Sequence, residues 1–394
     1  MKKHYKTKKA DMVMEIYLVY VLLALLLFWG VSFAKKGEFH ADYLSLKSAK
    51  CIEGFAAIGV IIHHLSQIFT NFAQIKSPLV PFNDIGAFFV GLFFFFSGYG
   101  LIKNLRTKEN YLKGFLWKRL VTVLVPFFFI NLIYITVRVI WGMRCSVWEY
   151  VSLFLGFRLV NGDAWYVIAI VILYIVFYLL FRFVKKEWIA FAGMAVFIAG
   201  YVAFCIFSGH GDGTRLLQGE WWCNTVPVFF LGLVWARFEG EIFGFAKKTY
   251  AVLLPVFSFA TLAMWYVMFY VLNSGHVGYW SEGPGNPAFE EKWVCLIIQS
   301  TATLFFVITC MLINMKVKFS NKVLSFLGGL TLSIYLIQRL FINYFVGMIP
   351  NQLLTVIVVV AVVVLAAFLV NLVCTQIKKL LLPKKKAEAV QTKQ

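Results

Sequence analysis

The sequence KCIEGFAAIGVIIHHLSQ, residues 50–67, has the length and apolarity of a membrane-spanning helix, yet it carries a carboxylate near its start and two adjacent imidazoles near its end. An ionisable group at membrane depth is costly and normally faces a protein interior or a water-filled cavity. Glu53 and His64 are separated by nearly three helical turns, so they share one face about 16 Å apart along the axis. His63 points roughly 100° away from His64. The stretch therefore predicts a functional site in which one of the two histidines is the reactive one.

The composition is that of a polytopic membrane protein. Of 394 residues, 61% are hydrophobic and only 14% are charged, and the mean hydropathy is +0.81. Soluble domains carry roughly 25% charged residues. The net charge of +19 comes from short clusters of Lys and Arg between apolar runs. Such clusters set membrane orientation and contact anionic lipid head groups. Nucleic acid is not an expected partner, because the chain has no basic helix or nucleic-acid-binding motif.

The seven cysteines lie mostly inside apolar segments and have no metal-binding spacing. We interpret them as small apolar packing residues. The sequence leaves open whether two of Cys145, Cys223 and Cys295 form a disulfide, because all three fall near outward-facing helix ends. No metal site is expected.

Ten apolar segments of about 20 residues predict ten membrane helices. They are residues 50–70, 85–105, 115–140, 163–182, 188–208, 222–240, 249–272, 293–314, 322–345 and 352–377. Basic loops alternate with Lys-poor loops, which places the basic set in the cytoplasm and both ends of this core inside. The sequence thus predicts an all-α, polytopic membrane helical bundle.

A further apolar run from Met12 to about Phe33 follows five lysines within the first ten residues. It is too long for a signal peptide and no small-residue cleavage site follows it, so we expect a retained helix. A spanning placement, which we favour, would leave the lysines outside, against the usual charge rule. The expected organisation is an N-terminal segment with an extra helix and linker (1–45), a membrane domain (46–378) and a basic cytoplasmic tail (379–394).

Five segments in chain order resemble the membrane acyltransferase-3 family. The helix from Glu53 to His64 is similar to the family's first core helix, where an Arg-Gly-hydrophobic-Ala start precedes a functional histidine by eleven residues. The other segments are FFVGLFFFFSGY (88–99), FLWKRL (115–120) leading to Pro126, WYV (165–167) with Tyr174, and LGGLTLSIYLI (327–337). Together they cover about residues 45–375. The resemblance implies a membrane acyltransferase with a ten-helix core.

The sequence departs from the family pattern at several positions. Glu53 stands where the family often has Arg, so any role of that Arg in binding a carbonyl or phosphate does not carry over, and Lys50 is the candidate substitute. Gln338 replaces the usual last histidine of the late motif, and Ile170 replaces a glutamate found in some members. These departures keep open a noncatalytic sensor built on the same fold.

The resemblance implies that His64 takes the proton of an attacking hydroxyl, because a histidine pKa lies near working pH. An acyl-histidine intermediate is the second possibility. His63 either serves the same site or packs between helices through hydrogen bonds, and both interpretations stay open. The developing oxyanion needs hydrogen-bond donors. The expected catalytic residues are His64, His63, Glu53, Ser97 and Tyr335.

The basic cluster from Lys103 to Arg119 precedes a helix on the expected cytoplasmic side. Its plain interpretation is topology and lipid contact. Acyl-coenzyme A is polyphosphorylated and cytoplasmic, so we expect Lys118, Arg119 and Lys113 to contact its phosphates. Its pantetheine arm would then reach His64 between helices.

Several charged residues fall near the outer face of the expected topology. They are Arg138, Arg158, Asp163, Glu220 and Asp212. Either two or three of them bind the hydroxyls of a glycan, or all are solvated loop charges.

The sequence favours an integral-membrane O-acyltransferase of the bacterial inner membrane. It would move an acyl group, expected to be acetyl, from acetyl-CoA to a hydroxyl of a cell-surface glycan or lipid-linked sugar. The alternative is a small-solute or lipid-linked-sugar transporter that uses His63 and His64 as a proton relay. Many transporters have inverted repeats and paired broken helices. Neither is evident in this sequence, which favours the enzyme.

Overall fold

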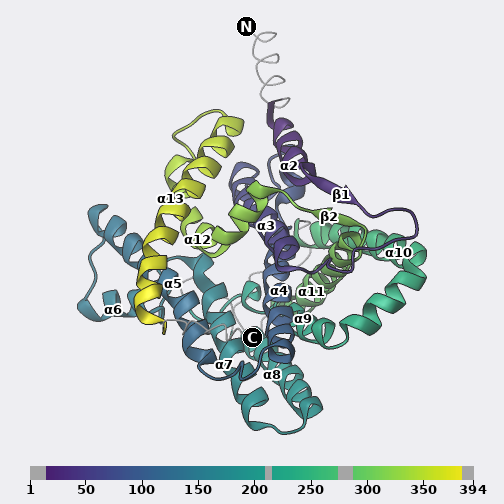
Figure 1. The fold of residues 1–394 in the computed structure, drawn as a ribbon. Coiled ribbons are helices and arrows are strands. Elements are labelled where there is room, and N and C mark those ends of the chain that lie inside the picture. The colour runs from purple at the N-terminus through teal and green to yellow at the C-terminus, as the bar shows by residue number, and fades with distance from the viewer. Residues whose placement is uncertain (1–14, 209–214, 274–286, 384–394) are drawn as a thin grey trace, which may run out of the picture.

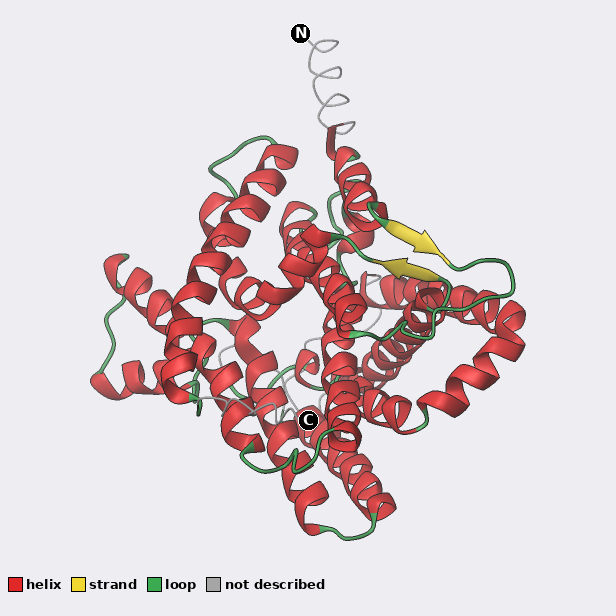
Figure 2. Ribbon diagram, in the orientation of Figure 1, coloured by secondary structure: helices red, strands yellow, loops and turns green. Residues whose placement is uncertain are grey.

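The computed structural model describes residues 15–208, 215–273 and 287–383, and this part of the chain is almost entirely helical (Figures 1 and 2). The α-helices are α2 (Leu18–Phe28), α3 (Leu46–Phe69), α4 (Gly86–Thr107), α5 (Phe115–Ile140), α6 (Val147–Leu155), α7 (Trp165–Phe183), α8 (Glu187–Phe207), α9 (Pro227–Arg237), α10 (Glu239–Asn273), α11 (Pro287–Asn314), α12 (Lys322–Phe345) and α13 (Gln352–Leu381). Short 3-10 helices are η1 (Val80–Phe82), η2 (Gly162–Ala164) and η3 (Glu220–Trp222). In the described residues, nine helices are long and apolar enough to cross a membrane. The protein is a polytopic helical bundle.

Helices α3 and α12 form the most extensive helix pair and lie near the middle of the bundle, with α4 beside α3 (Figure 1). Their backbones touch at two glycines. A Cβ added to Gly54 would overlap the carbonyl oxygen of Leu324, and one added to Gly328 would overlap the carbonyl oxygen of Lys50. Small residues permit this close approach. Helices in a membrane associate through such van der Waals packing, because the hydrophobic effect does not drive apolar helices together in lipid. The approach brings the polar faces of α3 and α12 together.

The segment expected to span the membrane at 222–240 is α-helical only from Pro227 onward. Helix α9 begins at Pro227, and Trp222, Asn224 and Val226 before it are buried although they lie outside any α-helix. Irregular backbone at membrane depth is tolerated only where protein or a watered cavity surrounds it. Here the Asn224 side chain donates to Gln299 Oε1 of α11 (2.8 Å), and Ser300 Oγ donates to the Asn224 carbonyl (2.8 Å). Ser300 of α11 therefore supplies the Asn224 carbonyl with a bond that a longer helix would have made internally, and Gln299 holds the Asn224 side chain.

The described part of the additional N-terminal helix is short: α2 has 11 residues, about 16 Å of helix, and both of its ends are bonded to other segments of the bundle. At its start, Glu15 accepts a hydrogen bond from Asn351, which precedes α13 (2.7 Å). At its end, the Leu26 carbonyl accepts from Asn321, which precedes α12 (2.9 Å). These two bonds tie α2 to the segments that precede α13 and α12. The expected helix to Phe33 is wrong at its end, since Val31–Phe33 form strand β1, antiparallel to β2 (Val317–Phe319).

Basic loops meet at the end of the bundle that charge assigns to the cytoplasm. Lys103 pairs with Glu239 (2.6 Å), and Glu187 lies 2.9 Å from Arg237 and 3.7 Å from Arg106. These contacts join the ends of α4, α8, α9 and α10. Lys318 of β2 pairs with Asp42 near the same end and holds the pKa of that carboxyl below its usual value.

We expect a cysteine introduced as Glu15→Cys to react with a membrane-impermeant maleimide added to intact cells, because Glu15 is bonded to Asn351 at the start of α13, whereas Lys378 and Lys379 lie in the last turn of that helix. The background carries Cys145→Ser, which removes a partly exposed thiol. Lys379→Cys, in the last turn of α13, is the matched control and should react only after permeabilisation. Reaction of both cysteines under the same condition would contradict this topology.

Candidate active site

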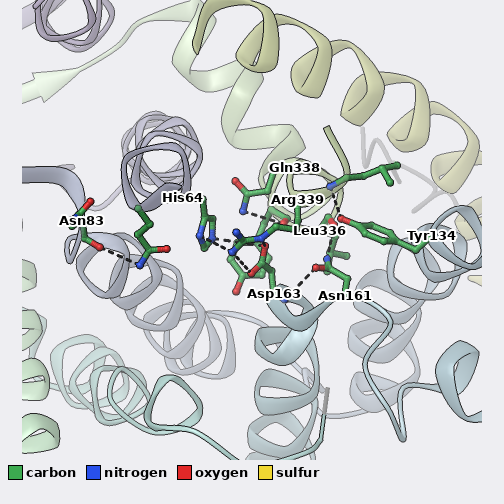
Figure 3. Close-up of polar contacts among 11 residues, drawn as sticks. His64, Asn83, Tyr134, Asn161, Asp163, Leu336, Gln338 and Arg339 are labelled. Carbon is green, nitrogen blue, oxygen red and sulfur yellow. Dashed lines mark hydrogen bonds and ion pairs between the residues drawn. The ribbon is translucent and has the colours of Figure 1, made fainter. Parts of the chain in front are cut away.

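A cluster of His64, Asp163 and Arg339 brings α3, η2 and α12 together (Figure 3). Arg339 grips the Asp163 carboxylate with two parallel hydrogen bonds, Nε to Oδ2 and Nη2 to Oδ1, both 3.0 Å long. The same Nη2 lies 2.9 Å from His64 Nδ1. His64 Nε2 lies 3.8 Å from Asp163 Oδ2. Only 12% of the His64 and Asp163 side chains is exposed, so this is an inward-facing charged site of the kind expected to be functional.

The contact with Arg339 fixes the tautomer of His64. A guanidinium has only donors and stays protonated. Nδ1 of His64 must therefore accept the hydrogen bond from Arg339 Nη2, and a neutral ring then carries its proton on Nε2. The 3.8 Å from Nε2 to Asp163 Oδ2 is too long for a strong hydrogen bond. The basic nitrogen of His64 is thus occupied by Arg339 in this arrangement.

Side chains from two other elements hold this turn of α12. Asn161 Nδ2 donates to the Leu336 carbonyl (2.8 Å), and the backbone N–H of Leu340 donates to Tyr134 Oη of α5 (2.9 Å). Asn161 also caps η2, because its Oδ1 accepts from the Asp163 N–H (3.2 Å). Asn161 therefore ties the segment that carries Asp163 to the helix that carries Arg339 (Figure 3).

His63 lies beside His64, with ring centroids 4.8 Å apart, but it makes different contacts. Its Nδ1 is 3.0 Å from the Phe82 carbonyl oxygen of η1, so Nδ1 donates. The other edge of the ring lies against Gly86, where an added Cβ would be 2.5 Å from His63 Nε2. Asn83 secures η1, since its Oδ1 accepts from both Ser66 and Thr70 of α3 (2.9 Å each). These contacts are those of a packing residue that joins α3 to η1 and α4.

A cavity of about 150 Å³ lies along the same helices. Its lining includes Glu53, Tyr166, Thr331 and Tyr335. Tyr335 lies one turn before Arg339 on the same face of α12, and Tyr166, at the start of α7, is three residues after Asp163 of η2. Polar groups therefore continue from the charged cluster along the cavity, between α3, α7 and α12, toward the basic end. We call this row, which includes Tyr166, Tyr335 and Glu53, the polar seam.

Glu53 points into this cavity and not at His64. Lys50, the candidate substitute for the family Arg, donates from Nζ to the Gly328 carbonyl (3.4 Å). Ser97 lies eleven residues into α4, about 16 Å beyond the Gly86 that touches His63. Its Oγ is hydrogen bonded to Tyr174 Oη (2.8 Å). The structure thus brings His63 to His64, but places Glu53, Ser97 and Tyr335 along the seam.

Arg119 lies at the basic end of the seam. Its guanidinium donates to Tyr111 Oη (2.8 Å) and lies 5.5 Å from the centroid of the Tyr174 ring. Burial raises the pKa of the Tyr111 hydroxyl, which therefore stays a neutral acceptor. Lys113 and Lys118 are exposed at the same end. A row of polar groups therefore connects the basic end with the cavity.

Arg339 is the functional candidate that the sequence did not single out. The available signal was a lone arginine near the end of an apolar helix, directly after the Gln338 that replaces the family histidine. Gln338 itself is buried and donates to the Tyr335 carbonyl (3.2 Å). Among the outer charged residues, Asp163 joins the site, whereas Arg158 lies 4.0 Å from Glu149 at the surface. Asp212 lies outside the described residues.

None of the seven cysteines, all of which lie in the described residues, forms a disulfide. The disulfide left open among Cys145, Cys223 and Cys295 is therefore not formed in this structure. The described residues contain no cluster of His, Cys, Asp and Glu that could hold a metal ion.

The fold and the charged intramembrane cluster define a multi-pass membrane protein with the features of an enzyme. A family model described as an acyltransferase domain, the acyltransferase-3 model, matches residues 46–375. The chain belongs to this family and is a membrane acyltransferase. No curated protein and no solved structure matches the chain. The family assignment favours acyl transfer over the transporter alternative.

Proposed function

We propose that the protein is an O-acyltransferase that moves an acetyl group from cytoplasmic acetyl-CoA to a hydroxyl of a glycan or lipid-linked sugar at the outer face of the bacterial inner membrane. The observation that carries this proposal is the His64–Asp163–Arg339 cluster at the end of the bundle opposite the basic loops. The family supplies acyl transfer, and the cluster supplies a base, a group that orients it and a fixed positive charge.

The reaction begins when the acceptor hydroxyl replaces Arg339 Nη2 at His64 Nδ1. The hydroxyl oxygen attacks the thioester carbonyl carbon while Nδ1 takes the hydroxyl proton. The carbon–sulfur bond then breaks, and the proton passes from Nδ1 to the departing thiolate. The products are an ester and free coenzyme A, so atoms and charge balance. An acyl-His64 intermediate is the second route.

Asp163 and Arg339 have separate roles in this step. Asp163 lies on the Nε2 side of His64, where it holds the ring orientation and stabilises the imidazolium that forms. Arg339 keeps one hydrogen bond to each oxygen of Asp163, so a small shift frees Nη2 from His64 without breaking the ion pair. The freed N–H then donates to the developing oxyanion.

The acetyl-CoA arm follows the polar seam. Its phosphates contact Lys113, Lys118 and Arg119 at the basic end. Its pantetheine arm passes Tyr174 and occupies the cavity of about 150 Å³, whose lining begins one helical turn from Arg339. Glu53, at the position where the family often has Arg, accepts a hydrogen bond from an amide N–H of the arm. A carboxylate can fill this position because the amide is an uncharged donor.

The test uses purified protein in sealed vesicles, sorted for a single orientation by protease protection of the C-terminal tail. Labelled acetyl-CoA is supplied at the basic side, and a mixture of membrane-extracted lipid-linked sugars at the other side. We expect thiol release together with labelled ester that mild base removes. Coenzyme A release that requires acetyl-CoA at the opposite side would overturn the proposed direction, and absence of both products would overturn the reaction.

A further inference from the structure

An apolar groove of about 470 Å³ lies between α5 and α6, which are side by side at the edge of the bundle (Figure 1). It is separate from the seam that holds the charged cluster. Its lining is formed by Leu132, Ile135, Val139, Tyr150, Val151 and Phe154. The lining is almost purely apolar, and 51% of Leu132 and 39% of Val151 is exposed. The groove is thus open at the periphery, where hydrocarbon surrounds the bundle.

The groove lies at the depth of the charged cluster. Tyr134, two residues from the groove residue Leu132, accepts the hydrogen bond from the Leu340 N–H beside Arg339. Asn131 donates to the Phe154 carbonyl (3.1 Å) and so holds the end of α6 against α5 at this level. The chain then runs from the end of α6 at Leu155 to Asp163 in eight residues. The wall of the groove is therefore connected directly to two elements of the site.

Two arginines, Arg138 and Arg144, lie at the outer end of the groove, where α5 ends at Ile140. Residues 138–158 contain three arginines and one acidic residue, Glu149. Arg138 precedes the groove residue Val139, and Arg144 donates to the Val139 carbonyl (3.2 Å). Trp141, directly after α5, is 60% exposed, and Trp148, in α6, is 81% exposed. Exposed tryptophans favour the level of lipid head groups. The arginines are thus placed where a head-group phosphate would lie.

We propose that this groove binds the hydrocarbon chain of a lipid-linked sugar phosphate, and that Arg138 and Arg144 bind its phosphate. The inference rests on the proposed function and selects the acceptor class: a lipid carrier, and not a free polysaccharide. A chain in the groove and a phosphate at its outer end hold the sugar beside α5 and η2. From there a sugar hydroxyl reaches His64 laterally, past Asp163. The apolar lining recognises the chain, and the arginine fork recognises phosphate oxygens.

The test is photolabelling of the purified protein in nanodiscs with two diazirine probes that share one isoprenoid chain. One probe carries a phosphate and the other a neutral hydroxyl. Peptide mapping should place the phosphate probe on residues 132–154, about five-fold more strongly than the neutral probe. Arg138→Gln with Arg144→Gln should abolish this preference. Equal labelling by both probes would overturn the proposal, because ordinary lipid contact needs no phosphate.

Groove-filling variants test the hydrocarbon contact. Leu132→Trp and Val151→Trp should each lower labelling at least about three-fold. Leu369→Trp on α13, a position 53% exposed on another helix, is the control and should label as the wild type does. Leu132→Ala, which cannot clash, should keep the labelling if Leu132→Trp acts by filling the groove. Labelling that Trp variants leave unchanged would place the chain elsewhere.

The outcome is independent of catalysis, because His64→Ala should bind the phosphate probe as the wild type does. Labelling of the groove in a protein without transferase activity would leave this inference standing and remove the proposed function. Transferase activity on a soluble glycan, without phosphate-dependent labelling, would do the reverse.

Discussion

Replacing His64 with alanine is expected to lower the rate of acetyl transfer by about 10²–10⁴-fold, the range typical of a positioned general base. The physical reason is that His64 Nδ1 is the one nitrogen in the cluster that can take a hydroxyl proton once Arg339 Nη2 moves away. Binding of coenzyme A should change little, because the phosphate contacts lie at the other end of the seam. Thiol release and base-labile ester, measured on the same samples, check both statements.

His63→Ala is the matched control, one residue away on the same helix. His63 contacts the Phe82 carbonyl and Gly86, so its loss should lower the thermal midpoint and leave most of the rate per folded molecule. An equal loss of rate in the two variants would contradict the separate roles. Full activity in His64→Ala, at normal expression, would exclude His64 as the base.

The second large effect is expected at the Asp163–Arg339 pair. Asp163→Asn keeps the shape of the side chain but removes the charge that faces His64 Nε2 and the partner of a largely buried guanidinium. We expect a loss of about 10²-fold or more in rate and about 3 kcal/mol in stability, since breaking a buried pair leaves an uncompensated charge. Arg339→Gln should give losses of similar size, measured by ester formation and by thermal unfolding.

The double variant Asp163→Asn with Arg339→Gln separates a catalytic role from a structural one. Removing both charges together should restore most of the lost stability, because neither charge is left unpaired. The rate should stay low, because neither the orienting carboxylate nor the oxyanion donor returns. Recovery of rate together with stability would show that the pair only supports the fold.

The positions of the membrane helices followed from sequence because their cause is local. Apolar runs of about 20 residues must form helices in hydrocarbon, where no water satisfies the backbone. The two failures have equally plain causes. Helix α9 is short because Gln299 and Ser300 of another helix satisfy the Asn224 region. The run to Phe33 ends early because Val31–Phe33 pair with β2, almost 300 residues away in the sequence.

The reactive end of the site could be predicted only in part. His64 could be predicted because it is an ionisable residue within an apolar helix and lies at the spacing of the family's functional histidine. Asp163 was one of several outer charges, and no local pattern distinguished it from Arg158 or Glu220. Arg339 was not predicted, because the family motif contains its neighbour Gln338 and ends before Arg339. Pairing between residues 64, 163 and 339 is a long-range property.

The sequence by itself determined the membrane class, the helical architecture, the family and one imidazole at membrane depth, because apolar length and charge spacing act within a single helix. Only the tertiary structure decided which groups surround that imidazole. The close approach of α3 and α12 at Gly54 and Gly328 turns their polar faces toward each other, and Asn161 fixes Asp163 against α12. These contacts arise from packing between distant segments, so the guanidinium on His64 Nδ1 could not be deduced from any one helix.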